Sequence, residues 1–81
     1  MTNYVIKPTS RNPSGYPREC QVLRNKLVIA QHLSFKTALA VLMFEGQATD
    51  QLVIRGNFAQ AMSLKEVWRL YGVTYNLAIP Q

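Results

Sequence analysis

The sequence predicts an α+β fold in which a mostly antiparallel sheet of four to five strands carries two helices on one face. Short β-prone runs crowd the first third of the chain, and two longer segments begin with serine and end with glycine, as helices often do. A β-prone run follows each of these segments. The resulting order is strand, strand, strand, helix, strand, helix, strand. A chain of 81 residues supports one core, so we expect a single domain over residues 1–81.

The first third of the chain predicts three strands and one long loop. Residues 3–8 (NYVIKP) alternate as a strand does, and we expect Pro8 to end it because proline has no amide for the sheet ladder. The stretch 9–17, rich in proline and glycine, predicts an exposed loop. Residues 19–23 and 26–31 predict two further strands, joined by a tight turn at Arg24 and Asn25.

One alternative for residues 26–45 is a single helix that begins near Lys26. Apolar residues at positions 27, 30 and 33 would extend the stripe of the helix that follows. The β-branched pair Val28 and Ile29 favours a strand instead, and Ser34 is a better place for a helix to begin.

The most apolar run, residues 33–46 (LSFKTALAVLMFEG), predicts a buried helix. Ser34 is placed to cap its first turn, and Gly46 suits the left-handed residue that closes many helices. Positions 35, 39, 42 and 43 share one apolar face, and the other positions leave little polar surface around the axis. We therefore expect other elements to cover this helix.

The second half predicts a strand, a helix and a final strand. Residues 51–55 (QLVIR) form a β-prone run that Gly56 and Asn57 end. Ser63 and Glu66 form a capping box at the start of the second helix, and Gly72 stops it. Residues 73–79 (VTYNLAI) alternate between larger apolar and smaller side chains, which predicts a half-buried last strand.

Two aromatic residues of the second helix, Trp68 and Tyr71, share its apolar face with Leu64 and Val67. Packing against the core is the favoured interpretation. The alternative is a protein interface, for which aromatic residues are common anchors, with Phe58 nearby. That alternative predicts a homodimer through Trp68 and Tyr71.

Composition and charge restrict the class of protein. Nine Lys and Arg residues against four Asp and Glu give a net charge of +5, which favours anionic partners but also serves simply to keep a small protein dispersed. A single cysteine, Cys20, excludes a disulfide framework and favours a reducing compartment. No run reaches the roughly 18–20 apolar residues that span a bilayer, and the N-terminus lacks the pattern of a signal peptide. We expect a cytoplasmic protein with no membrane partner.

The residue pattern predicts no enzyme. Cys20 and His32 are a candidate pair for nucleophilic catalysis, but no third, orienting group is evident, and a lone thiol in an apolar strand is usually a small core residue. The four acidic residues are not paired at metal or glycosidase spacing, and the four glycines are isolated rather than gathered in a phosphate loop. We therefore expect no catalytic residue, no metal and no cofactor.

Five of the nine cations fall within the first third of the chain, where Glu19 alone opposes them. If the loop 9–17 and the turn after residue 23 lie at the same end of the sheet, these cations form one basic surface with a tyrosine beside them. Arginine and tyrosine suit phosphates, bases and acidic protein surfaces. The alternative interpretation is a sheet edge guarded by cations. The candidate partner-binding residues are Lys7, Arg11, Tyr16, Arg18, Arg24 and Lys26.

Residues 63–76 (SLKEVWRLYGVTYN) resemble the opening of helix-turn-helix regulators of the excisionase type, in which a helix carrying Lys-Glu-Val leads through Gly-Val-Thr into a recognition helix. The resemblance implies a small basic DNA-binding regulator, with nucleic acid as its partner. The residues after Asn76 leave no room for a recognition helix, and Pro80 would break one. This function is therefore the alternative prediction.

Residues 4–8 (YVIKP) and 11–15 (RNPSG), followed by strand, serine-capped helix and strand, are similar in layout to small phage-encoded anti-CRISPR proteins directed at type I systems. The resemblance covers the first half of the chain. It implies a non-enzymatic inhibitor from a phage or mobile element that docks on a host protein or ribonucleoprotein complex, blocking target DNA or nuclease recruitment. Because the chain is basic, mimicry of DNA by an acidic surface is not the expected mechanism.

Overall fold

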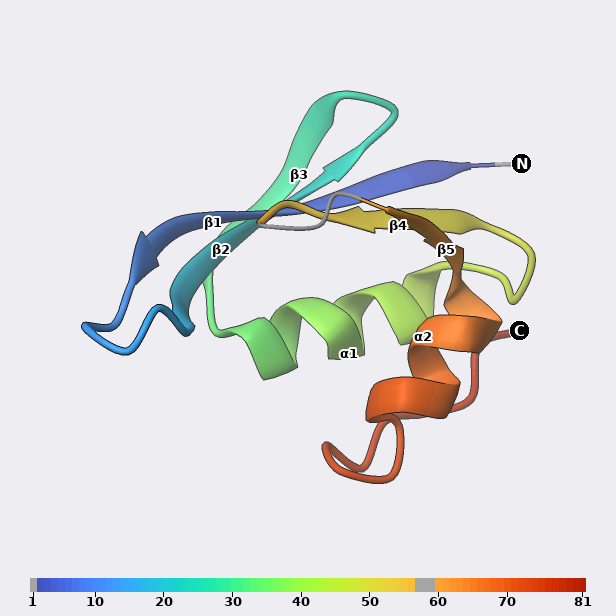
Figure 1. Cartoon of the computed structure of the whole chain (residues 1–81). Helices are drawn as coiled ribbons and strands as arrows, with labels where there is room; N and C mark the ends of the chain where they lie inside the picture. The colour runs from blue at the N-terminus through green and yellow to red at the C-terminus, as the bar shows by residue number, and fades with distance from the viewer. Residues whose placement is uncertain (1, 57–59) are drawn as a thin grey trace.

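A sheet of five strands lies over two helices that pack against one of its faces (Figure 1). The computed structural model describes residues 2–56 and 60–81. The predicted α+β fold, with a mostly antiparallel sheet, is confirmed. In chain order the elements are β1 (Asn3–Arg11), β2 (Pro17–Arg24), β3 (Leu27–Leu33), α1 (Phe35–Glu45), β4 (Gln51–Ile54), β5 (Ala61–Ser63) and α2 (Leu64–Tyr71).

The strands lie in the order β3-β2-β1-β4-β5. Neighbouring strands are antiparallel except β1 and β4, which are parallel. A parallel pair requires a long connection between strand ends, and α1, which runs beneath the sheet, is part of that connection (Figure 1). The apolar helix thus has a topological role as well as a packing role.

The core lies between the sheet and the helices. Alternate residues of β1 and β2 point into it, with Tyr4 and Ile6 from β1 and Cys20 and Val22 from β2. Each helix contributes its apolar stripe, as its spacing predicts. The buried apolar residues are Tyr4, Ile6, Cys20, Val22, Phe35, Ala38, Leu39, Leu42, Met43, Leu52, Leu64, Val67 and Leu77.

The first loop is shorter than predicted. β1 continues through Pro8 to Arg11, and β2 begins at Pro17, so the connection covers residues 12–16 instead of 9–17. Proline is tolerated inside β1 because β4 ends opposite Ile6, which leaves this part of β1 with a neighbour on one side only. A break in register between Pro8 and Ser10 accompanies it.

A tight hairpin joins β2 to β3, one residue later than predicted. Asn25 and Lys26 have φ angles of 48° and 73°, the left-handed pair that a two-residue turn requires. Leu27 then pairs with Arg24. The interpretation of residues 26–31 as a strand is confirmed, and the alternative of one helix from Lys26 is wrong.

The helix α1 ends at Gly46, but not for the predicted reason. Gly46 has φ −91° and ψ 172°, which is extended backbone and not a left-handed cap. A Cβ atom at this position would lie 2.3 Å from Cδ1 of Leu64, at the start of α2. Glycine is favoured here because the end of one helix closely approaches the buried first residue of the other.

The sheet covers α1 on one side, and the outer side of the helix remains exposed although its sequence leaves little polar surface around the axis. Phe35, Ala38 and Leu39 are among its buried residues, whereas Phe44 on the outer side is 82% exposed. The chain places no other element over this outer side in residues 2–56 and 60–81 (Figure 1). In that part of the chain, neither helix is long and apolar enough to cross a lipid bilayer.

The last strand of the sheet comes from a segment that the sequence did not mark. Residues 61–63 pair with β4 as β5, and residues 73–79, predicted as a strand, form a turn and an extended tail instead. Two hydrogen bonds hold this tail against α2: the Leu77 amide donates to the Gly72 carbonyl over 2.8 Å, and the Leu77 carbonyl accepts from Nε1 of Trp68 over 3.1 Å.

Half of the predicted capping box of α2 is present. The Ser63 hydroxyl accepts a hydrogen bond from the Glu66 amide over 3.2 Å. The Glu66 carboxylate accepts from Arg69 instead of reaching back to Ser63. The backbone of Ser63 belongs to β5, where Ser63 pairs with Gln51 of β4. It is therefore part of the sheet and is not paired with the Glu66 side chain.

Candidate functional site

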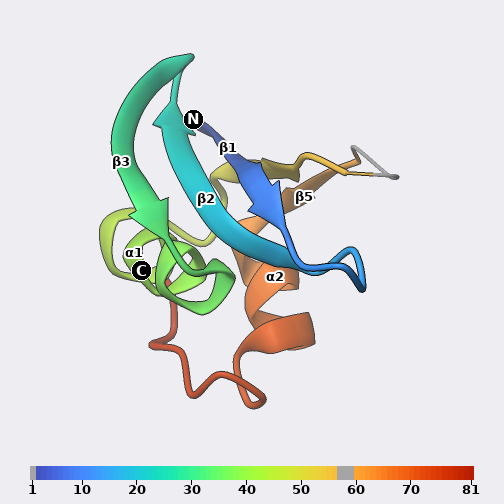
Figure 2. The same ribbon diagram turned by 90° about the vertical axis from the view of Figure 1, so that its left-hand side faces the viewer.

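The predicted basic residues do not form one surface. Arg11 and Tyr16 lie where β1 turns into β2, with Arg18 two residues further on, whereas Arg24 and Lys26 lie where β2 turns into β3. These turns are at opposite ends of β2 (Figure 2), about 23 Å apart at roughly 3.3 Å per residue. The expectation of a shared end is wrong because two consecutive hairpins of one sheet must turn at opposite ends of their common strand.

The residues Arg24 and Lys26 belong to a mixed-charge end of the sheet. Nη1 of Arg24 lies 3.2 Å from Oε1 of Glu45 in α1. The depression beside this pair is also lined by Asp50, whose carboxylate accepts hydrogen bonds from the Gln47 and Thr2 amides. These hydrogen bonds hold the pKa of Asp50 below its ordinary value, so its charge persists in mildly acidic solution. An anionic partner would therefore meet carboxylates here.

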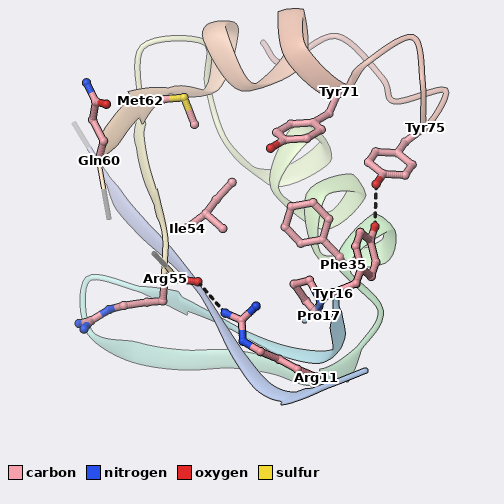
Figure 3. A pocket seen from close by; sticks show the side chains of 11 residues that line it. Arg11, Tyr16, Pro17, Phe35, Ile54, Arg55, Gln60, Met62, Tyr71 and Tyr75 are labelled. Atoms are coloured by element: carbon pink, nitrogen blue, oxygen red, sulfur yellow. Dashed lines mark hydrogen bonds between the residues drawn. The ribbon is translucent and has the colours of Figure 1, made fainter. Parts of the chain in front are cut away.

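The other end of β2 opens into an aromatic cavity of about 470 Å³ (Figure 3). We call it the tyrosine cavity. It is formed by the β1–β2 hairpin, the first turn of α1, the end of β4, β5, α2 and the turn after α2. The described residues that line it include no carboxylate; they are Arg11, Tyr16, Pro17, Phe35, Ile54, Arg55, Gly56, Gln60, Met62, Tyr71 and Tyr75.

The phenyl ring of Phe35 organises one wall of the tyrosine cavity. It makes edge-to-face contacts with Tyr16, Tyr71 and Tyr75, with ring centroids 6.2, 5.7 and 6.3 Å away. Tyr71 and Tyr75 stack on one another with centroids 6.0 Å apart. Such pairs are worth about 0.5–1.5 kcal/mol each beyond burial. The wall is therefore a preformed aromatic surface.

A hydrogen bond closes this wall. The hydroxyls of Tyr16 and Tyr75 lie 2.7 Å apart, across 59 residues of sequence (Figure 3). This bond, with burial, raises the pKa of Tyr16 to about 12. Tyr16 is thus neutral at physiological pH and brings no negative charge to the cavity.

The guanidinium of Arg11 lies at the rim of the tyrosine cavity. Nη1 donates to the Gly15 carbonyl over 2.8 Å, and Nη2 donates to the Arg55 carbonyl over 3.4 Å. A guanidinium has five N–H donors, so these two bonds position it and leave donors for a ligand. The side chain of Arg55 points away from the aromatic wall (Figure 3), so Arg11 is the cation that faces the cavity.

The arrangement suits an inserted group that is flat or apolar and carries negative charge. The aromatic wall offers stacking surface, and Arg11 offers charged donors that pair with carboxylate or phosphate oxygens. Arg18 is exposed close by on β2. Lys7, the remaining predicted residue, is not part of this site, because it lies further along β1, opposite Gln21.

The candidate catalytic pair is not assembled. Cys20 is fully buried, and burial raises the pKa of its thiol, as expected for the core residue that the sequence favoured. The imidazole of His32 is 76% exposed and lies 3.8 Å from the Glu19 carboxylate. Within the residues that the structure describes, no group of three or more His, Cys, Asp or Glu side chains could hold a metal ion.

The aromatic residues of α2 pack inward. Trp68 and Tyr71 are partly buried against the core, and Trp68 also donates to the Leu77 carbonyl. Tyr71 additionally lines the tyrosine cavity. The predicted homodimer through these residues stays a prediction, and Phe58, named with them, lies outside the described residues.

The segment after α2 departs from the helix-turn-helix pattern. Gly72 is followed by a turn to residue 76, where Asn76 has a φ of 53°, and the described chain then runs on without a further helix to Gln81. Its end is anchored, because the Gln81 carbonyl accepts a hydrogen bond from the Ala48 amide. The place of a recognition helix is thus taken by an extended tail.

The sequence marked Arg11 and Tyr16 but missed the rest of the tyrosine cavity. Phe35 reads as one residue of an apolar helix stripe, and Tyr75 reads as one residue of a strand. The available signal was the presence of four tyrosines in a small basic chain. Which of these tyrosines come together depends on how the segment after α2 folds back. No protein-family model matches this chain, and comparisons with curated proteins and with solved structures also found no match.

Proposed function

We propose that this chain is a non-enzymatic binding protein that docks on a macromolecular partner through the end of the sheet carrying Arg11, Tyr16 and Arg18. The observation that carries the proposal is the tyrosine cavity, which combines a preformed aromatic wall with one inward-facing guanidinium and has no carboxylate among its described lining residues. Tyrosine and arginine are the residue types that most often dominate binding energy at interfaces.

The first candidate partner is a host protein or ribonucleoprotein complex. The layout of the first half of the chain resembles that of phage anti-CRISPR proteins, so a type I CRISPR surveillance complex is the target to test first. In this proposal an acidic or aromatic anchor of that complex inserts into the tyrosine cavity, and the rest of the protein blocks target DNA or nuclease recruitment. The protein acts by occupancy and performs no chemistry on its partner.

The experiment is a pull-down of a purified type I surveillance complex by the tagged protein, with and without nuclease. Two double variants provide a matched comparison, Arg11→Glu with Arg18→Glu at the cavity end and Arg24→Glu with Lys26→Glu at the other end of β2. Each replaces two cations by two anions, a change of four charges, so each has a net charge of +1 instead of +5. We expect only the first pair to abolish binding; equal loss in both would show that net charge alone governs it.

The fold of each variant needs a separate check, because Arg11 also donates hydrogen bonds to the Gly15 and Arg55 carbonyls. Circular dichroism and thermal unfolding provide that check. The single variant Arg18→Glu leaves both hydrogen bonds intact and should still weaken binding. If the wild-type protein captures no surveillance complex, the proposed target is wrong.

The alternative proposal is a small DNA-binding regulator that uses the same cations on phosphates. Its binding would then fall with salt by about 0.9 log units per log unit of salt for each phosphate contact. A protein-docked inhibitor gives a shallower dependence and a defined stoichiometry. A partner that is lost on nuclease treatment, together with a steep salt slope, would favour the regulator.

A further inference from the structure

The face of the sheet opposite the helices is uncovered in the described part of the chain, because α1 and α2 both pack on the other side (Figure 1). Val5 of β1 lies between the buried Tyr4 and Ile6, so alternation places it on this open face. The pairing registers connect it to the neighbouring strands, because Val5 is opposite both Leu23 of β2 and Val53 of β4.

The row continues to both edges of the sheet. Leu23 pairs with Val28 of the edge strand β3, and Val53 pairs with Ala61 of the edge strand β5. One apolar residue from every strand therefore lies in a single line across the open face. We call it the apolar row; its members are Val28, Leu23, Val5, Val53 and Ala61.

The apolar row lies outside the hydrophobic core. None of its members is among the described residues that form the core or pack against it. Val28 is 50% exposed, and Val5, Leu23 and Val53 remain partly accessible although strands flank them. With strands about 4.8 Å apart, five strands form a stripe roughly 19 Å long. An apolar stripe on a sheet face that no other described element covers is a candidate docking surface.

Cations flank the apolar row along one side. Lys7 follows Val5 by two residues, and Arg55 follows Val53 by two, so both are in the next row. The Arg55 amide donates to the Ile6 carbonyl, which places Arg55 beside Lys7. Both are exposed, and in the described chain neither has a carboxylate within salt-bridge distance. The row on the other side is polar and uncharged, with Asn3, Gln51 and Ser63.

We infer that this open face is a second docking surface, and that its occupant is an amphipathic helix of a partner protein with acidic residues along one edge of its apolar stripe. A stripe of roughly 19 Å matches about 13 helical residues at 1.5 Å per residue. Acidic side chains on one edge of such a helix would meet Lys7 and Arg55 while its apolar residues cover Val5 and Val53.

Two other occupants fit the surface less well. A second copy of this chain would bring Lys7 and Arg55 against the same cations, against a neutral row, or against Glu19, whose carboxylate already lies 3.8 Å from Nδ1 of His32. Single-stranded nucleic acid binds sheet faces by stacking bases on aromatic side chains. The apolar row contains no aromatic side chain, so it offers no stacking surface for bases, and its aliphatic side chains would make no favourable contact with phosphates. Charge and shape together therefore favour an acidic amphipathic helix.

A synthetic peptide provides the test. The probe is a helical peptide of about 14 residues with leucine at i, i+4, i+7 and i+11 and glutamate along one flank, and the control peptide carries lysine in place of glutamate. Binding to the intact protein is followed by amide chemical shifts in NMR titrations. We expect saturable binding of the acidic peptide only, with shifts confined to the open face of the strands.

Two variants on the open face test the two parts of the inference. Lys7→Glu with Arg55→Glu should weaken binding about tenfold or more through the loss of charge pairing. Val5→Thr with Val53→Thr keeps the β-branched shape and should weaken it about tenfold by removing apolar contact. Arg24→Glu with Lys26→Glu is the control and should change it less than about threefold.

Several results would overturn the inference. One is the absence of saturable shifts, and another is shifts that map to the exposed side of α1 around Phe44. Equal affinity for both peptides would exclude the charge argument. Self-association in light scattering that the open-face variants abolish would identify a second copy as the occupant, and competition by oligothymidylate would identify nucleic acid. The peptide test needs no surveillance complex, and Val5→Thr with Val53→Thr changes no residue that lines the tyrosine cavity, so its result is independent of the proposed function. Because Arg55 also lines that cavity, the single variant Lys7→Glu gives the separate test of the charge pairing.

Discussion

Replacing Gly46 with alanine tests the close approach between the end of α1 and Leu64 of α2. The new Cβ would lie 2.3 Å from Cδ1 of Leu64, 3.0 Å from the Leu42 carbonyl oxygen and 3.3 Å from Cε2 of Tyr4. Leu64 is fully buried, so its side chain has to move against other core residues to make room. The backbone at Gly46 is extended, which alanine adopts readily, so the expected effect comes from packing and not from backbone strain.

The magnitude follows from two opposing terms. Overpacking in a close-packed core costs about 1–3 kcal/mol, whereas a glycine-to-alanine change stabilises by about 0.4–1 kcal/mol through the unfolded chain. We expect Gly46→Ala to lower the free energy of unfolding by about 1–2 kcal/mol, and the Tm by about 4–16 °C in a domain of this size. Urea unfolding followed by circular dichroism measures the first quantity, and thermal unfolding measures the second.

Two further variants isolate the cause. Gly56→Ala is the control, because its Cβ would come no closer than 3.5 Å to Nη2 of Arg11, and we expect no loss of stability. In a Leu64→Ala background, the cost of Gly46→Ala should shrink, because the shortest contact is gone while those with Leu42 and Tyr4 remain. Gly46→Ala that is as stable as the wild type, or a cost that is undiminished without the Leu64 side chain, would refute the reasoning.

Other predictions concern titrating groups. Asp50→Asn should destabilise the protein by about 1–3 kcal/mol at neutral pH, because its carboxylate accepts two backbone hydrogen bonds. Since the pKa of Asp50 is lowered on folding, this stabilisation is present above the unfolded pKa and is lost as pH falls through the folded one; a difference undiminished at pH 2 in urea unfolding would contradict this. Tyr16 has a pKa raised to about 12, so its stabilisation is complete below the ordinary tyrosine pKa and is lost as pH rises towards 12. In absorbance titrations, Tyr75→Phe should bring the pKa of Tyr16 back towards 10, and an unchanged titration would exclude the hydroxyl pair as the cause. Cys20 should react with iodoacetamide at neutral pH only after unfolding, because it is buried and its thiol pKa is raised; rapid labelling of the native protein would contradict that burial.

Local sequence was enough to predict most of the elements. Ser34 and Ser63 begin their helices as predicted because capping is a contact between residues three apart in the chain. The strand at residues 26–31, observed as Leu27–Leu33, was favoured because β-branched residues prefer extended backbone. Cys20 was interpreted correctly as a core residue on its apolar surroundings.

The errors arose where a distant part of the chain decides the local structure. Residues 73–79 alternate like a strand, but the Trp68 side chain takes the Leu77 carbonyl, and the edge of the sheet beside β4 is occupied by residues 61–63. Pro8 was expected to end β1 because the sequence does not show that β4 stops opposite Ile6. In both cases the secondary structure of the segment depends on which strand lies beside it. The residue pattern of one segment does not show which strand that is.

The sequence by itself determined the fold class, the apolar faces of both helices and the positive charge of the chain, because these depend on side-chain type and on spacing within one segment. Only the tertiary structure decided which residues meet. It separated Arg11 from Arg24 by the length of β2, joined Tyr16 to Tyr75 across 59 residues, and aligned one apolar residue from each strand on the open face. These contacts depend on the hydrogen-bond register of the strands and on the path of residues 72–81 after α2. Both are properties of the whole chain and not of one segment.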